Sequence, residues 1–316
     1  MTTTGVRIWG YGAAVPARRV TNEELSRRVE TTDEWIQERT GIRERRVLGQ
    51  GESLALLAAQ AGEQALAHTG LTPNDVDLIL LATSTPDDLF GSAPQVQALL
   101  GATRALAFDL TAACSGFAFA LVTAAQFVQA GTYQNVLVIG ADVLTRWVDW
   151  GDRRTCILFG DGAGAVVVSA SPVNHWLGWD GGTNGQDGHL LELAYRGEHY
   201  GPVDMNGREV YRFAVTTVPE VLAKALHRAG LTIPDVDWWI LHQANQRILD
   251  AVAQRLGIPP AQTVSHMGDY GNTSAASIPL ALAEIASQGQ LQSGQTVAIA
   301  GFGAGLSWGA AIFRWG

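Results

Sequence analysis

ALAHTGLTPNDVDLILL, residues 65–81, and ALHRAGLTIPDVDWWIL, residues 225–241, repeat one pattern in the two halves of the chain. In both copies a helical pattern ends at a glycine, where a left-handed C-cap is expected. A short turn follows, and then an apolar run typical of a buried strand. The order of helix, turn and strand therefore occurs twice. The identical positions include three pairs: Gly70 and Gly230, Asp75 and Asp235, and Asp77 and Asp237.

Two further segments extend the repeat. Residues 135–141, NVLVIGA, align with residues 295–301, QTVAIAG, as strand with strand. The glycine-rich run at 160–164 also resembles the run at 301–305. Three matches in the same order favour gene duplication. The alternative is that two α/β units resemble each other only because helix–glycine–strand segments are common.

The alternation of helix and strand in each half predicts an α/β fold with helix-covered sheets. We expect an N-terminal half at residues 1–172 and a C-terminal half at residues 173–316, joined by a loop rich in Gly and Asp around residues 170–185. A body with two equivalent halves brings their equivalent loops face to face. A functional site is expected where those loops meet.

Composition excludes several functional classes. The 316 residues are 47% hydrophobic, enough for a large core, and 21 basic against 30 acidic side chains give a net charge of −9. So acidic a chain lacks the basic field expected of a nucleic-acid-binding protein. No signal-peptide pattern opens the sequence and no apolar stretch reaches the ~20 residues that cross a bilayer, so we expect no membrane partner. Two cysteines do not suggest a disulfide framework, which favours a reducing, cytoplasmic location.

Cys114 is the first candidate for chemistry. It lies in DLTAACSG, residues 109–116, between a short strand and an apolar helix expected over residues 117–130. A thiol at a helix N-terminus feels the positive end of the helix dipole, which lowers its pKa and favours the thiolate. The alternative is an inert packing residue, and the local sequence does not decide. Cys156, in a strand-like run at 155–159, has no helix start beside it and is expected in the core.

His242 is the second candidate. It follows an apolar strand at 238–241, so it is expected at a strand's carboxyl end, where α/β active-site groups usually lie. A neutral imidazole there can donate a hydrogen bond or move a proton near neutral pH. A buried structural histidine is an equal alternative. The histidines form no pair at zinc-site spacing, so no metal site is expected.

Asn272 and a glycine-rich turn complete the candidates. Asn272 lies in YGNTSAAS, residues 270–277, just before a helix expected over 278–288. The duplication makes it the near-equivalent of Cys114, although an ordinary helix N-cap is the alternative. GFGAG, residues 301–305, has no βαβ unit after it. We expect a tight turn there whose N–H groups could stabilise an oxyanion, rather than a dinucleotide loop.

With these residues in view, the chain resembles the β-ketoacyl-acyl carrier protein (ACP) synthase III family of the thiolase superfamily. The resemblance covers essentially the whole length and decides between the alternatives above, because the family uses a Cys-His-Asn triad. Elongating synthases resemble Cys-His-His instead, and thiolases carry a second catalytic cysteine near the C-terminus. The motifs that carry the resemblance are TDEWIQERTGI (32–42), the segment around Cys114, FGDGAG (159–164), HQANQRI (242–248), GNTSAAS (271–277) and GFGAGLSWG (301–309).

The resemblance implies a thiolase-like duplicated fold, with two pseudo-twofold-related halves in a layered α-β-α-β-α body. It implies a decarboxylative Claisen condensation of a short acyl-CoA, by default acetyl-CoA, with malonyl-ACP. The product is a 3-oxoacyl-ACP, formed through an acyl-Cys114 intermediate without a metal or redox cofactor, and the reaction initiates fatty-acid synthesis.

The resemblance also implies roles for individual residues. Phe90 would reach across a homodimer interface into the partner's acyl pocket. The implied sets are Cys114, His242 and Asn272 for catalysis; the backbone of Cys114, Gly303 and Ala304 for the oxyanion hole; Trp35, Arg39 and Arg153 for CoA; Arg247, Arg212 and Arg255 for ACP docking; and Phe90 and Phe302 for the acyl pocket.

Two other functions remain to be weighed. One is an acyltransferase of the same fold that moves an acyl group from Cys114 to an oxygen or nitrogen nucleophile in secondary metabolism. The intact triad favours condensation over this activity. The other is a non-catalytic thiolase-fold subunit that shapes a partner's pocket, and the presence of Cys114 argues against it.

Overall fold

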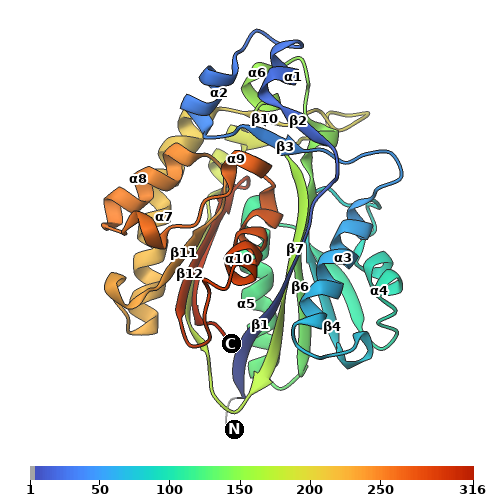
Figure 1. Ribbon diagram of the computed structural model, residues 1–316, viewed down its shortest axis with the longest axis vertical. Helices are drawn as coiled ribbons and strands as arrows, with labels where there is room; N and C mark the ends of the chain where they lie inside the picture. Colours follow the sequence, from blue (N-terminus) through green and yellow to red (C-terminus); the bar gives the residue numbers. More distant parts are fainter. Residues whose placement is uncertain (1–3) are drawn as a thin grey trace.

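The computed structural model describes residues 4–316, and within them two sheets repeat one topology (Figure 1). The larger sheet has the strand order β1-β7-β6-β4-β5, and the smaller has the order β11-β12-β13-β8. Read from β8, the smaller sheet matches the larger one read from β1. The strands are β1 (Gly5–Ala14), β4 (Leu78–Ala82), β5 (Leu106–Leu110), β6 (Asn135–Val143), β7 (Asp161–Ser171), β8 (Trp176–Thr183), β11 (Trp238–Leu241), β12 (Thr296–Gly303) and β13 (Ser307–Arg314).

The repeat that opened the sequence is a true structural equivalence. Helices α3 (Leu54–Ala67) and α7 (Gly207–Ala229) are followed by glycines in the left-handed region, Gly70 at φ 71° and Gly230 at φ 69°. Each glycine leads through a short 3-10 turn into a buried strand, β4 or β11. The prediction of helix, turn and strand in both halves is confirmed.

The match between the two glycine-rich runs was wrong. Residues 160–164 enter β7, whereas residues 301–305 leave β12. The strand pairings identify the true equivalents. Gly140 of β6 pairs with Gly164, and Gly301 of β12 pairs with Gly309. Gly140 and Gly301 therefore occupy the same place in the two halves.

The join between the halves is also different from the expected loop. β7 ends at Ser171 and β8 (Trp176–Thr183) follows, so half of the segment 170–185 is a strand at the edge of the smaller sheet. Its glycines allow close packing rather than a loop. A Cβ on Gly178 would lie 2.8 Å from the carbonyl oxygen of Ala225 in α7. Glycine in a strand often marks such an approach of another backbone.

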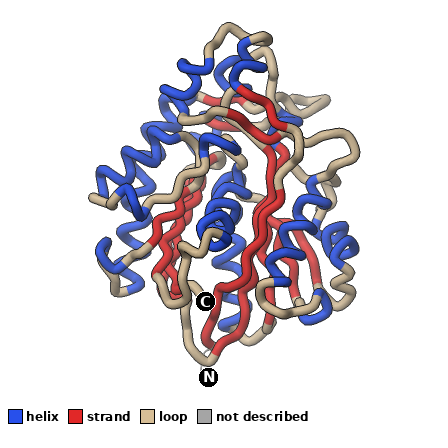
Figure 2. Tube along the Cα trace, in the orientation of Figure 1, coloured by secondary structure: helices blue, strands red, loops and turns tan. Residues whose placement is uncertain are grey.

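The layers follow from helices that are apolar on most sides. α5 (Gly116–Gln129) and α10 (Ser277–Ser287) lie between the two sheets and share one core cluster with both (Figures 1 and 2). Such helices must be buried on every side. α3 and α4 (Ala93–Leu100) cover the other face of the larger sheet, and α7 and α8 (Gln246–Leu256) that of the smaller. The predicted α-β-α-β-α body is confirmed.

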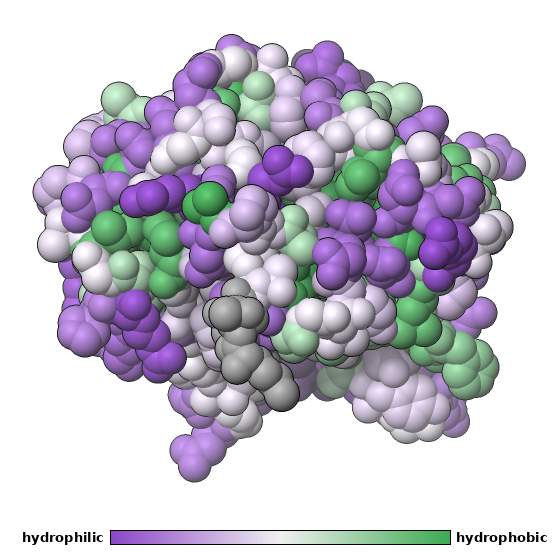
Figure 3. Space-filling model, turned by 90° about the horizontal axis from the view of Figure 1, so that it is seen from below, coloured by the Kyte–Doolittle hydropathy of each residue, from purple (hydrophilic) through white to green (hydrophobic). Residues whose placement is uncertain are grey.

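Short elements cover one end of both sheets (Figure 1). The strand-like run expected at 155–159 is wrong, because Cys156 ends helix α6, yet its side chain is buried as predicted. No helix in residues 4–316 is long and apolar enough to cross a membrane. The face seen from below carries small, separate apolar patches among polar residues (Figure 3). The short elements are β2 (Arg19–Thr21), α1 (Asn22–Ser26), α2 (Asp33–Thr40), β3 (Glu44–Arg46), α6 (Arg153–Cys156), β9 (Leu191–Glu192), β10 (Asp204–Met205) and α9 (Met267–Tyr270).

Candidate active site

Two equivalent turns bring the halves together. The 3-10 turn η2 (Ala113–Ser115) leads into α5, and η7 (Ser274–Ala276) leads into α10. Each begins with a non-glycine residue in the left-handed region, Ala113 at φ 46° and Ser274 at φ 52°. Such residues are strained by roughly 1–3 kcal/mol and cluster at functional sites. The counterpart of Cys114 is therefore Ala275, and the predicted equivalence with Asn272 was wrong by three positions.

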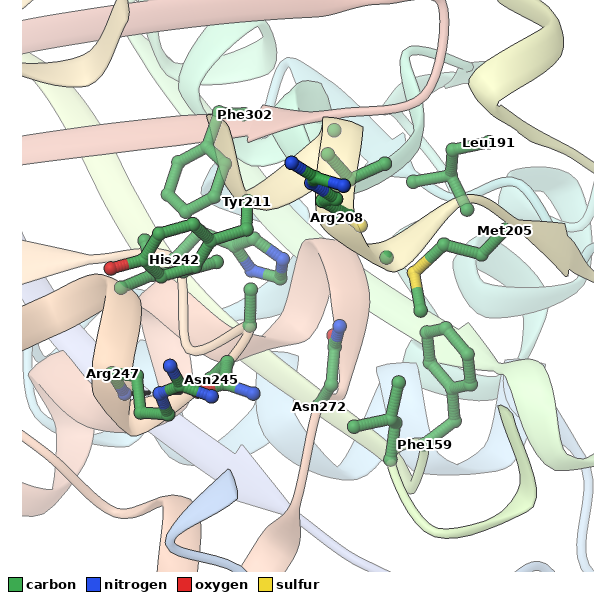
Figure 4. Close-up of a pocket in the computed structure, with 17 residues that line it drawn as sticks. Phe159, Leu191, Met205, Arg208, Tyr211, His242, Asn245, Arg247, Asn272 and Phe302 are labelled. Carbon is green, nitrogen blue, oxygen red and sulfur yellow. Dashed lines mark hydrogen bonds between the residues drawn. The ribbon is translucent and has the colours of Figure 1, made fainter. Parts of the chain in front are cut away.

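One cavity contains all three candidate side chains. Cys114, His242 and Asn272 line a cavity of about 380 Å³ that opens between α7, α8 and the ends of the strands (Figure 4). Cys114 also lines a second cavity of about 550 Å³, whose walls include Leu144 and Trp147. The thiol therefore lies where two cavities meet.

The thiol of Cys114 is buried, and burial governs its acidity. Loss of water around the thiolate raises the pKa of Cys114 to about 12, while a hydrogen bond from Ser274 Oγ to Sγ, 3.3 Å long, acts in the opposite direction. The predicted lowering of this pKa by the helix start was wrong, because desolvation of the charged form outweighs it. The resting group is a thiol, so its proton must leave as it reacts.

His242 is held as a neutral hydrogen-bond donor. Its backbone N–H donates to Ala300 in β12, which fixes it at the end of β11. Its Nδ1 lies 2.7 Å from Ser277 Oγ, which already accepts from the backbone N–H of Gln243. The serine proton is thus available to donate to Nδ1, and the imidazole proton is assigned to Nε2. Burial lowers the pKa of His242 to about 3, so the ring is neutral near pH 7.

Asn272 is oriented by its own turn. Its Oδ1 accepts from the backbone N–H of Ser274 at 2.9 Å, and its backbone N–H donates to Leu158. The carbonyl end of the amide is therefore engaged with the protein. The NH₂ end is the donor that remains for a group bound in the cavity.

The turn after β12 packs directly on the thiol. A Cβ on Gly303 would lie 2.9 Å from Cys114 Cβ and 3.1 Å from Sγ, so only glycine fits there. Ser307 Oγ lies 2.6 Å from Ser115 Oγ and thereby ties this turn to η2. Ala304 lines the second cavity beside Cys114. The three backbone groups predicted for an oxyanion hole are thus neighbours.

The predicted CoA contacts form a separate group on α2 and α6. The guanidinium carbons of Arg39 and Arg153 lie 4.7 Å and 4.8 Å from the ring centroid of Trp35. Segments far apart in the sequence therefore place two cations on one indole. None of the three lines either cavity around Cys114.

The predicted docking arginines differ in their surroundings. Arg247, at the start of α8, lines the first cavity and lies 5.7 Å from the ring of Tyr211. Arg212 pairs with Glu209 at 3.4 Å, and Arg255 donates to the carbonyl of Val215. Arg247 is thus the one that reaches the cavity.

The two predicted acyl-pocket aromatics lie apart. Phe302 lines the first cavity and meets His242 edge-on, with ring centroids 5.1 Å apart (Figure 4). It is absent from the wall of the second cavity. Phe90 is fully exposed on this chain, at 101%.

Four residues near the site were missed from the sequence. Ser274 and Ser277 lie inside the GNTSAAS motif, but serines before a helix are usually caps. Asp142 lies near the end of β6, where it is the only charged residue of the strand, and that isolated charge was a usable signal. Arg208 lines the cavity only because α7 begins beside it (Figure 4).

Known proteins share both the sequence and the fold. Residues 108–185 match the 3-oxoacyl-(acyl-carrier-protein) synthase III family, and residues 226–315 match its C-terminal family. The β-ketoacyl-ACP synthase III of Nostoc sp. is 59% identical over 329 aligned positions that cover 100% of both chains.

Solved structures extend the likeness to three dimensions. The 3-oxoacyl-ACP synthase III of Aquifex aeolicus has a TM-score of 0.95 at 43% identity, covering 98% of this chain and 100% of that one. A priming β-ketosynthase from a polyketide biosynthetic pathway has a TM-score of 0.95 at 36% identity, covering 99% and 97%. The chain therefore belongs to the β-ketoacyl-ACP synthase III family of the thiolase superfamily.

Proposed function

We propose that the protein condenses a short acyl-CoA, by default acetyl-CoA, with malonyl-ACP to give a 3-oxoacyl-ACP, the first condensation of fatty-acid synthesis. The observation that carries this proposal is the meeting of Cys114, His242 and Asn272 in one cavity of a chain from this family. The reaction is ping-pong, with an acyl-enzyme between its two halves.

The first half-reaction transfers the acyl group. Cys114 Sγ attacks the thioester carbon, and CoA leaves as the carbon–sulfur bond to it breaks. The backbone N–H groups of Cys114 and of the turn at Gly303 and Ala304 hold the oxyanion. Donors that are already in place stabilise the developing charge without reorganising.

The second half-reaction makes the carbon–carbon bond. Malonyl-ACP loses CO₂, and the thioester enolate accepts hydrogen bonds from His242 Nε2 and the Asn272 NH₂ group. A neutral imidazole suits this role, because it donates without first giving up a proton. The enolate carbon then attacks the acyl-Cys114 carbonyl, and the thiolate is expelled.

The two cavities around Cys114 support this order of events. The first cavity carries the triad and Arg247 and receives each thioester arm in turn. The second, with Leu144, Trp147 and other apolar residues in its wall, receives the acyl group. We propose that Arg247 also helps to dock the acidic carrier, with Arg212 and Arg255 further along α7 and α8. The acyl chain stays in the second cavity while the first is emptied and refilled.

We propose that Trp35, Arg39 and Arg153 bind the nucleotide end of CoA. The indole offers a flat face, and the two guanidinium groups beside it complement phosphate charge. No metal or redox cofactor enters the proposal, because the condensation changes no oxidation state of the protein and uses only groups of this chain and its substrates.

A homodimer is the partner state we propose. β5 is the edge strand of the larger sheet, and its Leu106 and Phe108 are 54% and 37% exposed. Asp109 of the same strand accepts from the backbone N–H of Ser92, which anchors the loop that exposes Phe90. A bare apolar edge strand is an aggregation hazard unless it is covered. A second copy would cover it, and a Phe90→Asp variant should be monomeric by light scattering.

The proposed compartment is the reducing cytoplasm. Cys114 and Cys156 are both free thiols. A nucleophilic thiol that forms a thioester must stay reduced.

Acylation followed by condensation tests the proposal. The protein is incubated with acetyl-CoA, and its mass is measured before and after malonyl-ACP is added. One acetyl group on Cys114, discharged as acetoacetyl-ACP with release of CO₂, is the expected result. Transfer to an oxygen or nitrogen acceptor without CO₂ would indicate the alternative acyltransferase, which the intact triad and the relatives support less.

A further inference from the structure

A buried carboxyl group lies behind one wall of the second cavity. Asp161 begins β7 and has no exposed surface. Its Oδ1 accepts from the backbone N–H of Thr145 at 3.0 Å, and its Oδ2 accepts from Thr145 Oγ1 at 2.6 Å and from the backbone N–H of Leu48 at 2.8 Å. The carboxyl group therefore holds the segment after β3 and the 3-10 turn η3 (Leu144–Trp147).

The turn η3 forms part of the cavity wall. Leu144 and Trp147, its first and last residues, line the second cavity. The carbonyl of Trp147 accepts from the backbone N–H of Val203 at 2.8 Å, and its ring meets the ring of Tyr200 edge-on, with centroids 5.9 Å apart. Val203 and Tyr200 line the same cavity. The position of η3 therefore determines where the residues on both sides of Trp147 lie.

An ion pair joins η3 to another part of the wall. Arg146 pairs with Asp87 at 2.7 Å, in the loop whose Pro86 and Leu89 also line the second cavity. The side chain of Arg146 is 37% exposed, and exposed ion pairs contribute little to stability. The buried hydrogen bonds from Asp161 are therefore the stronger anchor of the turn.

The anchor requires an acceptor at both oxygens of the side chain. Burial raises the pKa of Asp161 to about 6, although the hydrogen bonds from Thr145 and Leu48 act in the opposite direction. At pH 8 the group is therefore mostly ionised, and hydrogen bonds to an ionised acceptor are stronger than neutral ones. An asparagine amide has one acceptor oxygen and a donor NH₂ group. In its place, at least one of the two segments would lose its attachment.

The second cavity has room for more than an acetyl group. Its volume of about 550 Å³ falls within the range of pockets that hold drug-sized ligands. Discrimination between acyl chains then depends on how closely the wall follows the chain. One methylene group in a fitted apolar pocket changes the rate by roughly 10- to 200-fold. A wall that can move loses part of this discrimination.

We propose that Asp161 is a positioning residue for acyl selectivity, because it holds η3 and so fixes the wall against which the acyl chain on Cys114 packs. The inference rests on the proposed function, since this wall selects a substrate only if Cys114 is acylated. Asp161 lines neither cavity around the thiol. It acts through Leu144 and Trp147.

A series of acyl-CoA thioesters tests the proposal. The rate of CoA release is measured at pH 8 with acetyl-, butanoyl-, hexanoyl- and octanoyl-CoA, without malonyl-ACP, and intact mass confirms acylation of Cys114. Wild type should prefer one chain length. Asp161→Asn should lower the ratio between the best and the poorest thioester by about tenfold. Decarboxylation of malonyl-ACP, which uses the first cavity, should fall far less.

A pair of variants at Thr145 tests the same contact from η3. Thr145→Val removes the hydroxyl that donates to Asp161, whereas Thr145→Ser keeps it. Thr145 lines neither cavity around Cys114. Only the valine variant should lower the selectivity ratio. The pair also decides the question if Asp161→Asn does not fold.

Asp77→Asn is the matched control for a general loss of stability. Asp77 precedes β4 and accepts from the backbone N–H groups of Gln134 and Asn135, at 2.8 Å and 3.0 Å. It is absent from the walls of both cavities around Cys114. Asp77→Asn should lower the melting temperature and leave the selectivity ratio unchanged.

The outcomes separate the inference from the proposed function. If wild type shows no preference, or if Asp161→Asn and Thr145→Val keep the wild-type ratio, the role of Asp161 is overturned and the proposed function stands. An equal fall in Asp77→Asn also overturns it, since the effect would then follow from stability alone. If none of the four thioesters acylates wild type, the proposed function is wrong and the inference fails with it.

Discussion

The turns η2 and η7 have the same backbone and different chemistry. In both, a left-handed residue precedes a 3-10 turn that opens a helix between the sheets. In η2 the next residue is Cys114, which faces two cavities, whereas in η7 it is Ala275, which faces neither. The duplication therefore gave two equivalent turns. One of them, η2, carries the nucleophile, and the other, η7, supports it.

The ends of β12 and β6, which lie behind the two turns, explain why the turns differ in chemistry. Gly303 of β12 lies against Cys114, and Asp142, at the corresponding position of β6, binds the N–H of Ala275. The packing is reciprocal, because a strand of each half packs against the turn of the other half. Gly140 of β6 packs on Ala275, and Gly301 of β12 packs on Ser115. Each turn is thus held by a strand of the opposite half.

Moving the nucleophile between the turns should have the largest effect. Cys114→Ala should lower self-acetylation on the order of 10⁴-fold, because Cys114 is the only thiol that lines either cavity within residues 4–316. Adding Ala275→Cys should not restore it, since that side chain packs against Gly116 rather than a cavity. Intact mass after incubation with acetyl-CoA measures both, with Cys156→Ala as the control that keeps full labelling. Restored labelling in the double variant would show that the two frames are interchangeable.

Removing the amide beside η7 should separate the two half-reactions. Asn272→Ala should slow malonyl-ACP decarboxylation by about 100-fold, the usual cost of one oxyanion donor. Acetylation of Cys114 should fall far less, since the amide serves the enolate. CO₂ release and CoA release are compared on one preparation. Equal losses in both steps would assign Asn272 an architectural role.

Adding a methyl group behind each turn tests the reciprocal packing. Gly301→Ala would place a Cβ 2.9 Å from the Cα of Ser115, and Gly140→Ala would place one against the carbonyl of Ala275. We expect each to lower the free energy of unfolding by about 1–3 kcal/mol, the usual cost of overpacking. Urea unfolding gives the comparison. A loss in only one variant would mean that the halves are not held symmetrically.

We expect the smallest change in stability from substitutions at the two 3-10 turns inside the sequence repeat. Thr72 and Thr232 cap their 3-10 turns in the same way, each with an aspartate three residues later. Thr72→Ala and Thr232→Ala should therefore lower the melting temperature equally, by about 2 °C or less. The hydroxyl also lowers the pKa of Asp75 and Asp235, so the stabilisation is present above about pH 4 and is lost as pH falls below it. Calorimetry at pH 7 and pH 3 measures both points.

Local pattern was sufficient for the α/β fold class, whereas the layered α-β-α-β-α body followed from the family resemblance. The pattern also placed Cys114 and His242 at the correct ends of their elements. Three sequence patterns each predicted one structural feature: the repeat, the glycines at helix ends and the helices that are apolar on most sides. The strand β8 was not predictable, because its glycines read as loop until α7 is known to pack on them. The exact partner of Cys114 in the other half required the φ values at Ala113 and Ser274, which no spacing encodes.

The chemistry of the site was harder to predict than its location. A helix start beside Cys114 suggests a thiolate, but the pKa depends on how much water the folded chain excludes. Asp142 and Ser274 each contact the opposite half, through hydrogen bonds to Ala275 and to Cys114. Such contacts appear only when the sheets and the helices between them are assembled.

The stacking of Arg39 and Arg153 on Trp35 has a consequence for how acyl-CoA binding depends on salt concentration. If acyl-CoA binds there as proposed, its flat adenine ring would take the place of a guanidinium group on the indole and would exchange one stacking contact for another. Little free energy is gained from that exchange. The proposed binding of acyl-CoA would then depend mainly on its phosphates meeting the released cations, and the apparent KM for acyl-CoA should rise as ionic strength screens them.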